Sequence, residues 1–272
     1  MRFKFAVLLV SLLHFQISPG ECRSVYFQQE RDSIKVVLAD PGNQQPMEAA
    51  KTSNVKWAQK SKYILPAFFV GYGFTSLSKG FTRQTDVDIR HELLEEYPHF
   101  STNFDDKLQY VPVAAVYTLN LMGIKGKNNT FDRTALYLIS NSIMGISVNF
   151  LKANTDKLRP SGANTRSFPS GHTATAFVGA EFMNQEFSDT SPWYGYVGYT
   201  MATATGALRM MNDQHWMSDV LAGAGVGILS TKLTYFAYPW IKKKLIKNTN
   251  PNFIAVPIVQ GKIVGFSLMA PL

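Results

Sequence analysis

The side chains best suited to chemistry in this sequence lie between residues 152 and 219. This stretch combines fixed positive charges, a turn of small residues, two histidines and a carboxylate. They form three clusters, which are Lys152 with Arg159, residues 169–172, and Arg209 with His215 and Asp219. Cations and free backbone N–H groups bind phosphate oxygens, and a histidine can attack phosphorus. The stretch therefore predicts a site that binds a phosphate and breaks one of its ester bonds.

The first cluster places two cations on one face of a predicted helix. Lys152 and Arg159 are seven residues apart, which corresponds to two helical turns. Pro160 ends the helix directly after Arg159, so that the guanidinium can extend outward. Arginine can bind two phosphate oxygens as a fork, whereas lysine acts as a point charge. Taken alone, the pair is better interpreted as a solvated basic face.

The second cluster opens a predicted helix. Ser170 is a favoured N-cap residue, and the free N–H groups at a helix start bind anions. Gly171 allows a ligand to approach the backbone closely, and His172 stands in the first turn above that anion site. A plain helix cap with a surface histidine explains an isolated tetrapeptide equally well.

The third cluster pairs a histidine with a carboxylate. His215 and Asp219 are four residues apart on a predicted helix, so that the carboxylate can reach one ring nitrogen and orient the other. Arg209 lies in the preceding turn and can enter the same cleft. The alternative interpretation is a surface ion pair near a helix start.

The three clusters together supply the parts of a single reaction. Three cations neutralise a phosphate, and backbone donors stabilise the charge that builds up in the transition state. His215, with a carboxylate behind it, can attack phosphorus, and His172, for which no partner is predicted, can give a proton to the leaving oxygen. No carboxylate cluster suited to Mg²⁺ or Ca²⁺ is apparent, so no metal site is predicted.

These motifs resemble the superfamily of type-2 phosphatidic acid phosphatases, bacterial non-specific acid phosphatases and vanadium-dependent haloperoxidases. The pattern of that family is lysine, six residues and Arg-Pro, then Pro-Ser-Gly-His, then Ser-Arg, five residues, histidine, three residues and aspartate. The same spacings occur here, and the resemblance covers about residues 109–240 with the flanking helices. Leu208 departs from the pattern, because the family usually has serine before the third-cluster arginine. We expect altered packing or substrate fit there.

The resemblance implies a role for each matched residue. His215 is implied to be the nucleophile that becomes phosphohistidine, Asp219 to orient it, and His172 to protonate the leaving group. The residues implied to hold the phosphate oxygens are Lys152, Arg159, Ser170, Gly171 and Arg209. The resemblance implies that the phosphoryl transfer needs no metal, and no cofactor is predicted for this chain. Arg166, between the first two motifs, is expected to face solvent.

Composition limits the class of partner. The chain has 272 residues, a formal net charge of +8 and a charged fraction of 17%, below the roughly 25% of a typical soluble domain. A basic chain favours nucleic acid, anionic membranes or phosphorylated substrates. No nucleic-acid motif is present, so no nucleic-acid partner is predicted and a membrane surface or a phosphate substrate is favoured. The mean hydropathy of -0.06 does not indicate a dense polytopic membrane protein.

The first residues have the pattern of a secretory signal. Two basic residues precede an apolar run at 5–13, and small residues follow at 18–20. We therefore predict a signal peptide over 1–20, then a polar lead-in over 21–60 with extended or loosely helical structure. Cys22 raises the question of a lipid anchor, but Glu21 stands where a small residue is expected.

The strong periodic segments are helical, which predicts an all-α protein with a helical bundle over 61–248. Helices are expected over 63–77, 86–97, 109–124, 134–158, 170–187, 193–208 and 215–247. Small residues along these segments favour close helix packing. Residues 249–272 form an appendix in which 252–259 and 262–269 predict a short β-hairpin.

The apolar segments of about 15 to 18 residues are at the low end of the length that spans a bilayer. Aromatic residues beside lysines over 235–247 fit a membrane interface or the amphipathic end of a soluble helix. We predict an exported enzyme, periplasmic or membrane-associated, whose site lies outside the cytoplasm and accepts a phosphorylated lipid or another phosphate ester. The alternatives are a soluble acid phosphatase, a haloperoxidase with vanadate in the site, and a non-catalytic lipid or phosphate binder. The oligomeric state is left open.

Overall fold

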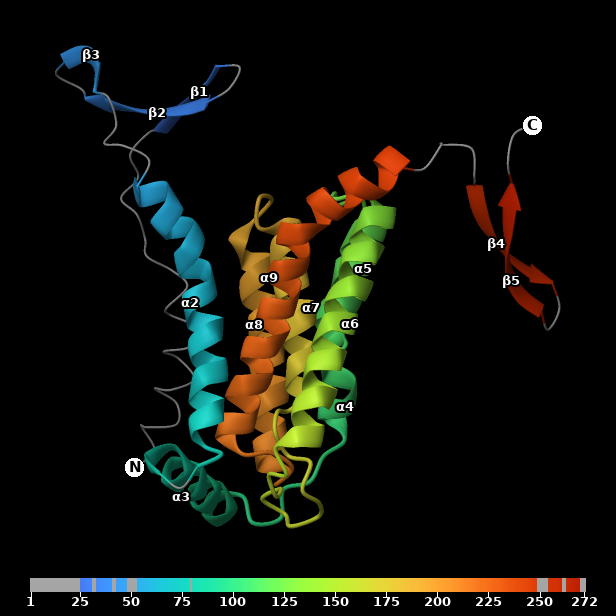
Figure 1. Ribbon diagram of the computed structural model, residues 1–272. Helices are drawn as coiled ribbons and strands as arrows, with labels where there is room; N and C mark the ends of the chain where they lie inside the picture. The colour runs from blue at the N-terminus through green and yellow to red at the C-terminus, as the bar shows by residue number, and fades with distance from the viewer. Residues whose placement is uncertain are drawn as a thin grey trace.

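The computed structural model describes residues 25–30, 33–40, 43–47, 53–78, 80–248, 254–260 and 263–269. The predicted signal peptide over 1–20 and the question of lipidation at Cys22 lie outside the described residues. Eight helices are described and confirm the predicted all-α bundle (Figure 1). They are α2 (Ser53–Thr75), α3 (Phe81–Glu96), α4 (Phe104–Leu108), α5 (Val111–Leu121), α6 (Thr130–Asn154), α7 (Gly171–Phe187), α8 (Pro192–Met211) and α9 (Met217–Asn248).

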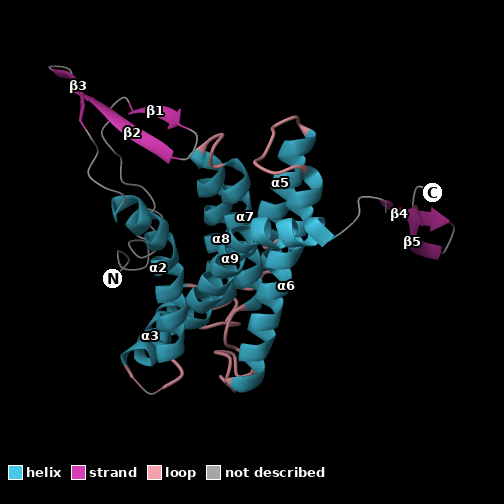
Figure 2. Cartoon of the chain, turned by 45° about the horizontal axis from the view of Figure 1, so that its top comes forward, coloured by secondary structure: helices cyan, strands magenta, loops and turns pink. Residues whose placement is uncertain are grey.

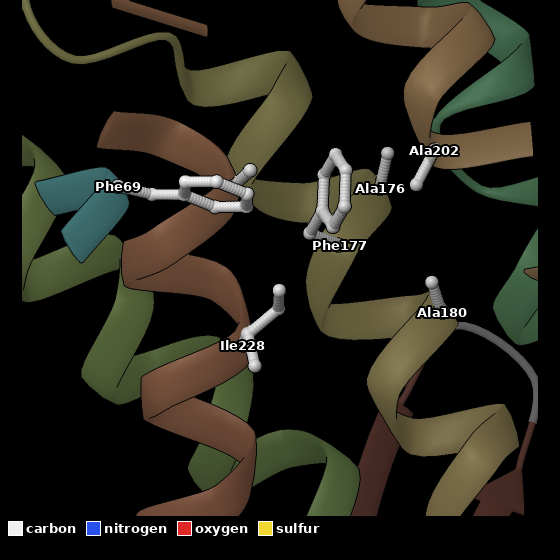
Figure 3. Packing of buried hydrophobic residues seen from close by; sticks show 7 residues of the cluster. Phe69, Ala176, Phe177, Ala180, Ala202 and Ile228 are labelled. Atoms are coloured by element: carbon white, nitrogen blue, oxygen red, sulfur yellow. The ribbon is translucent and has the colours of Figure 1, made fainter. Parts of the chain in front are cut away.

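Helix α7 lies at the centre of the bundle. It packs against α5, α6, α8 and α9, and α2 covers the other side of α9. A core cluster joins α2, α7, α8 and α9, and Figure 3 shows how its side chains meet. Its buried members are Phe69, Ala176, Phe177, Ala180, Ala202, Ala224 and Ile228. Most of α7 is buried, so its ends are held rigidly by the surrounding helices.

Small residues bring α7 and α9 into backbone contact, as the sequence predicts. A Cβ atom added at Gly223 would lie 2.5 Å from the carbonyl oxygen of Ser170, and one at Gly227 would lie 2.4 Å from that of Ala174. No side chain fits at these distances, so glycine is required for the two helices to approach so closely. This contact fixes the first turn of α7 against the first turns of α9.

Several helix boundaries differ from the predicted ones, and two of these lie next to the site. The sequence predicts one helix through 158, but α6 ends at Asn154 and Asp156 has a positive φ of 41°. The last helix is expected from His215, but α9 begins at Met217. The carboxylate of Asp219 accepts a hydrogen bond from the Trp216 backbone, which caps the helix after His215. His215 therefore lies in the loop before α9.

Strands flank the bundle in the sequence. The lead-in, predicted to be extended or loosely helical, contains three strands. They are β1 (Val25–Glu30), β2 (Ser33–Asp40) and β3 (Asn43–Met47), and they form an antiparallel sheet in the order β1-β2-β3. The predicted C-terminal hairpin corresponds to β4 (Ile254–Gln260) and β5 (Ile263–Met269), paired antiparallel from Ile254 with Met269 to Gln260 with Ile263. Within the described residues, neither sheet packs against a helix.

Candidate active site

The three predicted clusters meet at one end of the bundle. Lys152 lies in the last turn of α6, His172 in the first turn of α7, Arg209 near the end of α8, and Asp219 in the first turn of α9. The backbone N–H of Ser170 donates to the carbonyl oxygen of Asp219 at 3.0 Å, which ties the second cluster to the third. Figures 1 and 2 show the loops of this end together with α3.

His215 is buried, with 3% of its surface exposed. Its Nδ1 lies 3.7 Å from Oδ2 of Asp219, a distance longer than a hydrogen bond. Within the described residues this Nδ1 has no hydrogen-bond partner, and Asp219 Oδ2 accepts from the Ser167 hydroxyl and the Trp216 backbone. The predicted pairing is therefore present as a close contact and not as a hydrogen bond.

Burial lowers the pKa of His215 to about 4. Asp219 opposes this shift, whereas the positive charges of Lys152 and Arg159 add to it. The imidazole is therefore neutral at neutral pH, and a neutral ring has the free electron pair that a nucleophile needs.

Ser170 caps α7 as the sequence predicts, and its side chain is fully buried. Its oxygen accepts from the backbone N–H of Thr173 and lies 2.8 Å from the Thr173 hydroxyl. A Cβ atom at Gly171 would meet only Val148, at 3.9 Å. Packing within the protein therefore does not require glycine at 171, and the space above its backbone is free for a ligand.

His172 has a partner, contrary to the prediction. Its Nε2 lies 2.8 Å from Oδ1 of Asp106, which α4 places beside the start of α7. Burial and the charge of Arg209 lower the pKa of His172, and Asp106 opposes them. The sequence could not reveal this contact, because 66 residues separate the two side chains.

The three predicted phosphate-binding cations lie close enough together for their charges to interact. Arg209 is buried and donates from one guanidinium nitrogen to Asp105 at 2.7 Å, while its Nε has no partner among the described residues. Arg159 donates to Asn164 and Gln214, and Lys152 donates to the carbonyl oxygen of Arg166 at 2.8 Å.

The positive charges of these side chains repel one another and are not fully balanced by the nearby carboxylate. Burial lowers the pKa of Arg159, and the nearby charge of Arg209 lowers it further. Asp219 opposes the effect, but its carboxylate is already engaged by neighbouring donors. A bound phosphate would relieve this repulsion. Arg166 is exposed to solvent, as expected.

Several charged and polar residues of the site are absent from the predicted set. They are Asp105 and Asp106 on α4, Asp86 on α3, and Lys157 and Ser167 in the loop after α6. Lys157 is buried in the protein interior, where its Nζ lies close to the carboxylates of Asp86 and Asp219. An isolated charged residue is usually solvent-exposed, so no local pattern marks these positions.

The donor side chains of the described residues do not form a metal site. Within the part of the chain that the structure describes, no three His, Cys, Asp or Glu side chains converge as a metal ion requires. Reaction without a metal therefore stays a prediction to be tested by chelation.

Fold and site together define a helical protein in which two histidines and three cations lie at one end of the bundle. Residues 133–243 match the family model of the PAP2 superfamily, so the resemblance drawn from the motif spacings is confirmed over this region. All eight predicted site residues fall inside it, whereas α3 and α4 lie outside.

Similar proteins include a lipid A 1-phosphatase from Porphyromonas gingivalis, which is 38% identical over 168 residues. The alignment covers 61% of this chain and 37% of that protein, so the chain spans little more than a third of its relative's length. The crystal structure of LpxE from Aquifex aeolicus has a TM-score of 0.41 at 19% identity, covering 54% of this chain and 93% of that one. Another similar structure is the transmembrane PAP2 type phosphatidylglycerolphosphate phosphatase from Bacillus subtilis. Its TM-score is 0.47 at 20% identity, and the match covers 70% of this chain and 98% of that one.

Proposed function

We propose that this chain is a phosphatase that hydrolyses a phosphate monoester or diphosphate of a lipid through a phosphohistidine on His215. The observation that carries the proposal is a neutral, buried histidine next to Asp219, within the field of Lys152, Arg159 and Arg209. The match to the PAP2 superfamily over these residues supports it.

In the first step, Nε2 of His215 attacks phosphorus and the bond between phosphorus and the leaving oxygen breaks. Asp219 stabilises the positive charge that develops on the ring, since its carboxylate faces Nδ1. The leaving oxygen takes a proton from the protonated form of His172. Backbone N–H groups at the start of α7 stabilise the phosphoryl oxygens, together with Nε of Arg209, which has no partner among the described residues.

In the second step, a water molecule attacks the phosphohistidine. The now neutral His172 takes a proton from this water, the bond between phosphorus and Nε2 breaks, and phosphate leaves. Both histidines then return to their starting protonation states. Asp106, bound to His172, stabilises its protonated form, and this contact favours proton return between the two steps.

A lipid substrate is favoured by the surface of the bundle. Helices α6 and α9 are long and apolar enough to cross a membrane by length and composition. Only 22% of the most apolar window of α6 is buried, and Leu138, Ile146 and Phe150 on it are exposed. Such a face is stable in lipid and costly in water. The window of α9 is 56% buried, as in a core helix.

The first substrate to test is a lipid A 1-phosphate, because that is the substrate in the name of the related protein from Porphyromonas gingivalis. Phosphatidic acid, phosphatidylglycerol phosphate and undecaprenyl diphosphate complete the panel. We also propose that the site lies on the side of the membrane opposite the cytoplasm. Intact cells should then hydrolyse a membrane-impermeant phosphate ester as fast as permeabilised cells.

The proposal is tested by release of phosphate from this panel in detergent micelles, with and without EDTA. The wild type should be active and insensitive to EDTA, and His215→Ala should reduce kcat by about 1,000-fold or more. Wild type quenched in alkaline SDS, in which phosphohistidine is stable, should carry a phosphoryl group that His215→Ala lacks. Activity retained in His215→Ala would refute the nucleophile. No turnover of any ester would favour a binding protein, and bromide oxidation with vanadate would favour a haloperoxidase.

A further inference from the structure

Behind Asp219 lies a buried ionic cluster that the reaction described above does not use. Asp86 is 2% exposed and Lys157 is 7% exposed, although both carry a charge. Nζ of Lys157 donates to the hydroxyl of Ser218 at 2.7 Å and to Asp86 Oδ2 at 3.2 Å, and it lies 3.0 Å from Asp219 Oδ1. It also donates to Ser76 at 2.9 Å.

The cluster joins segments that are far apart in the chain. Asp86 belongs to α3, Lys157 to the loop after α6, and Ser218 to the first turn of α9. Asp86 accepts from both the backbone N–H and the hydroxyl of Ser218, the residue next to Asp219. A carboxylate and an ammonium are costly to bury unless each is paired, so every member depends on the others for its position.

The charges of the cluster affect the nucleophile. Asp86, Lys157 and Asp219 together carry a net charge of −1 when each is ionised. Without Asp86, the ammonium of Lys157 would be balanced by Asp219 alone. Asp219 would then have less negative charge available to stabilise the positive ring that forms on His215.

Helix α3 holds the loop of His215 at a second point. Arg90 donates two hydrogen bonds to Asp213, at 2.7 and 2.9 Å, and its guanidinium lies 5.9 Å from the centre of the Trp216 ring. Asp213 has a positive φ of 55°, a conformation that non-glycine residues seldom adopt without support. The ion pair supplies that support two residues before His215.

We infer that Asp86 is a positioning residue for phosphoryl transfer, which acts through Lys157 and Ser218 to fix Asp219 against His215. The inference rests on the proposed function and extends it to α3, which lies outside the region that matches the PAP2 superfamily. The catalytic unit is therefore larger than the three sequence motifs.

Asp86→Asn tests the inference, because it keeps the size of the side chain and removes the charge. We expect kcat to fall by about tenfold to a hundredfold with KM changed less than twofold, since phosphate contacts are untouched and only alignment is lost. Asp88→Asn is the matched control, because it makes the same change on the exposed side of the same helix. Asp86→Glu should recover part of kcat.

A second readout is independent of activity. The pKa of His215, followed by NMR of a protein with ¹⁵N-labelled histidine, should be lower in Asp86→Asn than in wild type. The charged groups that face this ring are Asp219, which raises its pKa, and Lys152 and Arg159, which lower it. Removing a negative charge from the cluster adds to the lowering. An unchanged His215 pKa would overturn the inference even if no substrate were turned over.

If thermal unfolding shows that Asp86→Asn does not fold, another variant is needed to test the inference. Ser218→Ala removes one hydroxyl and leaves both carboxylates and Lys157 in place. We expect a several-fold loss of kcat with near-normal KM. Wild-type kcat in Ser218→Ala or in folded Asp86→Asn overturns the positioning role, whereas an inactive wild type overturns the proposed function.

Discussion

The two histidines of the site differ in their surroundings at the scale of single residues. His215 is buried beside a carboxylate that other donors already engage, and His172 is half-buried against a more exposed carboxylate. Burial lowers the pKa of both, but that of His215 falls to about 4. The shift of the His215 pKa to about 4 keeps its ring neutral at neutral pH, as the proposed nucleophile requires. The contact with Asp106 favours the protonated form of His172, as the proposed acid requires.

The role of His172 predicts a dependence on the leaving group. His172→Asn should reduce kcat on a lipid phosphate by about 100- to 10,000-fold, because an alkoxide leaves poorly without a proton. On p-nitrophenyl phosphate the loss should be far smaller, since nitrophenolate needs no proton to leave. His99→Asn, on an exposed loop, serves as control. Equal losses on both esters would contradict the acid role.

The pH profile of kcat/KM should be bell-shaped. Activity should rise with pH through about 4 as His215 loses its proton, and fall above the pKa of His172, which lies below its ordinary value. Asp106→Asn removes a charge that raises this pKa, so the descending limb should move to lower pH. Asp189→Asn makes the same change on an exposed turn after α7 and should leave the profile unchanged. A descending limb that stays in place would exclude His172 as its source.

Helix contacts position the motifs at the scale of elements. The first turns of α7 and α9 touch through glycines, so the start of α7 with Ser170 and the loop of His215 are held on one rigid pair of helices. Helix α4 adds Asp105 and Asp106 to this pair, and α3 adds Asp86 and Arg90.

Gly227→Ala should destabilise the protein because its Cβ would lie 2.4 Å from the Ala174 carbonyl oxygen, a rigid backbone atom. Overpacking of this kind costs about 1–3 kcal/mol. Gly145→Ala on α6 meets nothing within 4 Å and should be neutral or stabilise by up to about 1 kcal/mol. Thermal unfolding in detergent compares the two. Equal unfolding temperatures would mean that α7 and α9 are less closely packed than the structure shows.

At the scale of the whole molecule, the site lies at one end of the bundle, and lysines gather at the C-terminal end of α9. Lys242, Lys243 and Lys244 lie there beside Trp240, which is 67% exposed. Aromatic and basic residues in such proximity are typical of a membrane interface. The bundle would then hold its site at one surface of a membrane, within reach of a lipid headgroup.

A membrane-embedded bundle predicts that the protein stays in the membrane fraction after a carbonate wash. Ile146→Lys on the exposed face of α6 should reduce recovery in that fraction, since a lysine within a span costs about 2.5–3.5 kcal/mol. Phe131→Lys, in the first turn of the same helix, should be tolerated because the ammonium can reach the interface. Release of the wild type by carbonate would show a peripheral or soluble protein.

The sequence by itself determined the all-α class, the three motifs and the residues 152–219 in which they lie. These features depend on local rules, since caps, prolines and helical periods act within a few residues of the chain. The tertiary structure alone decided the partners of those motifs. Asp86, Asp106 and Lys157 reach the site from segments whose local patterns are ordinary, because only helix packing brings them beside His215 and His172. Burial removes these charges from water, so that they interact strongly with one another. Burial depends on the tertiary fold and not on the local sequence.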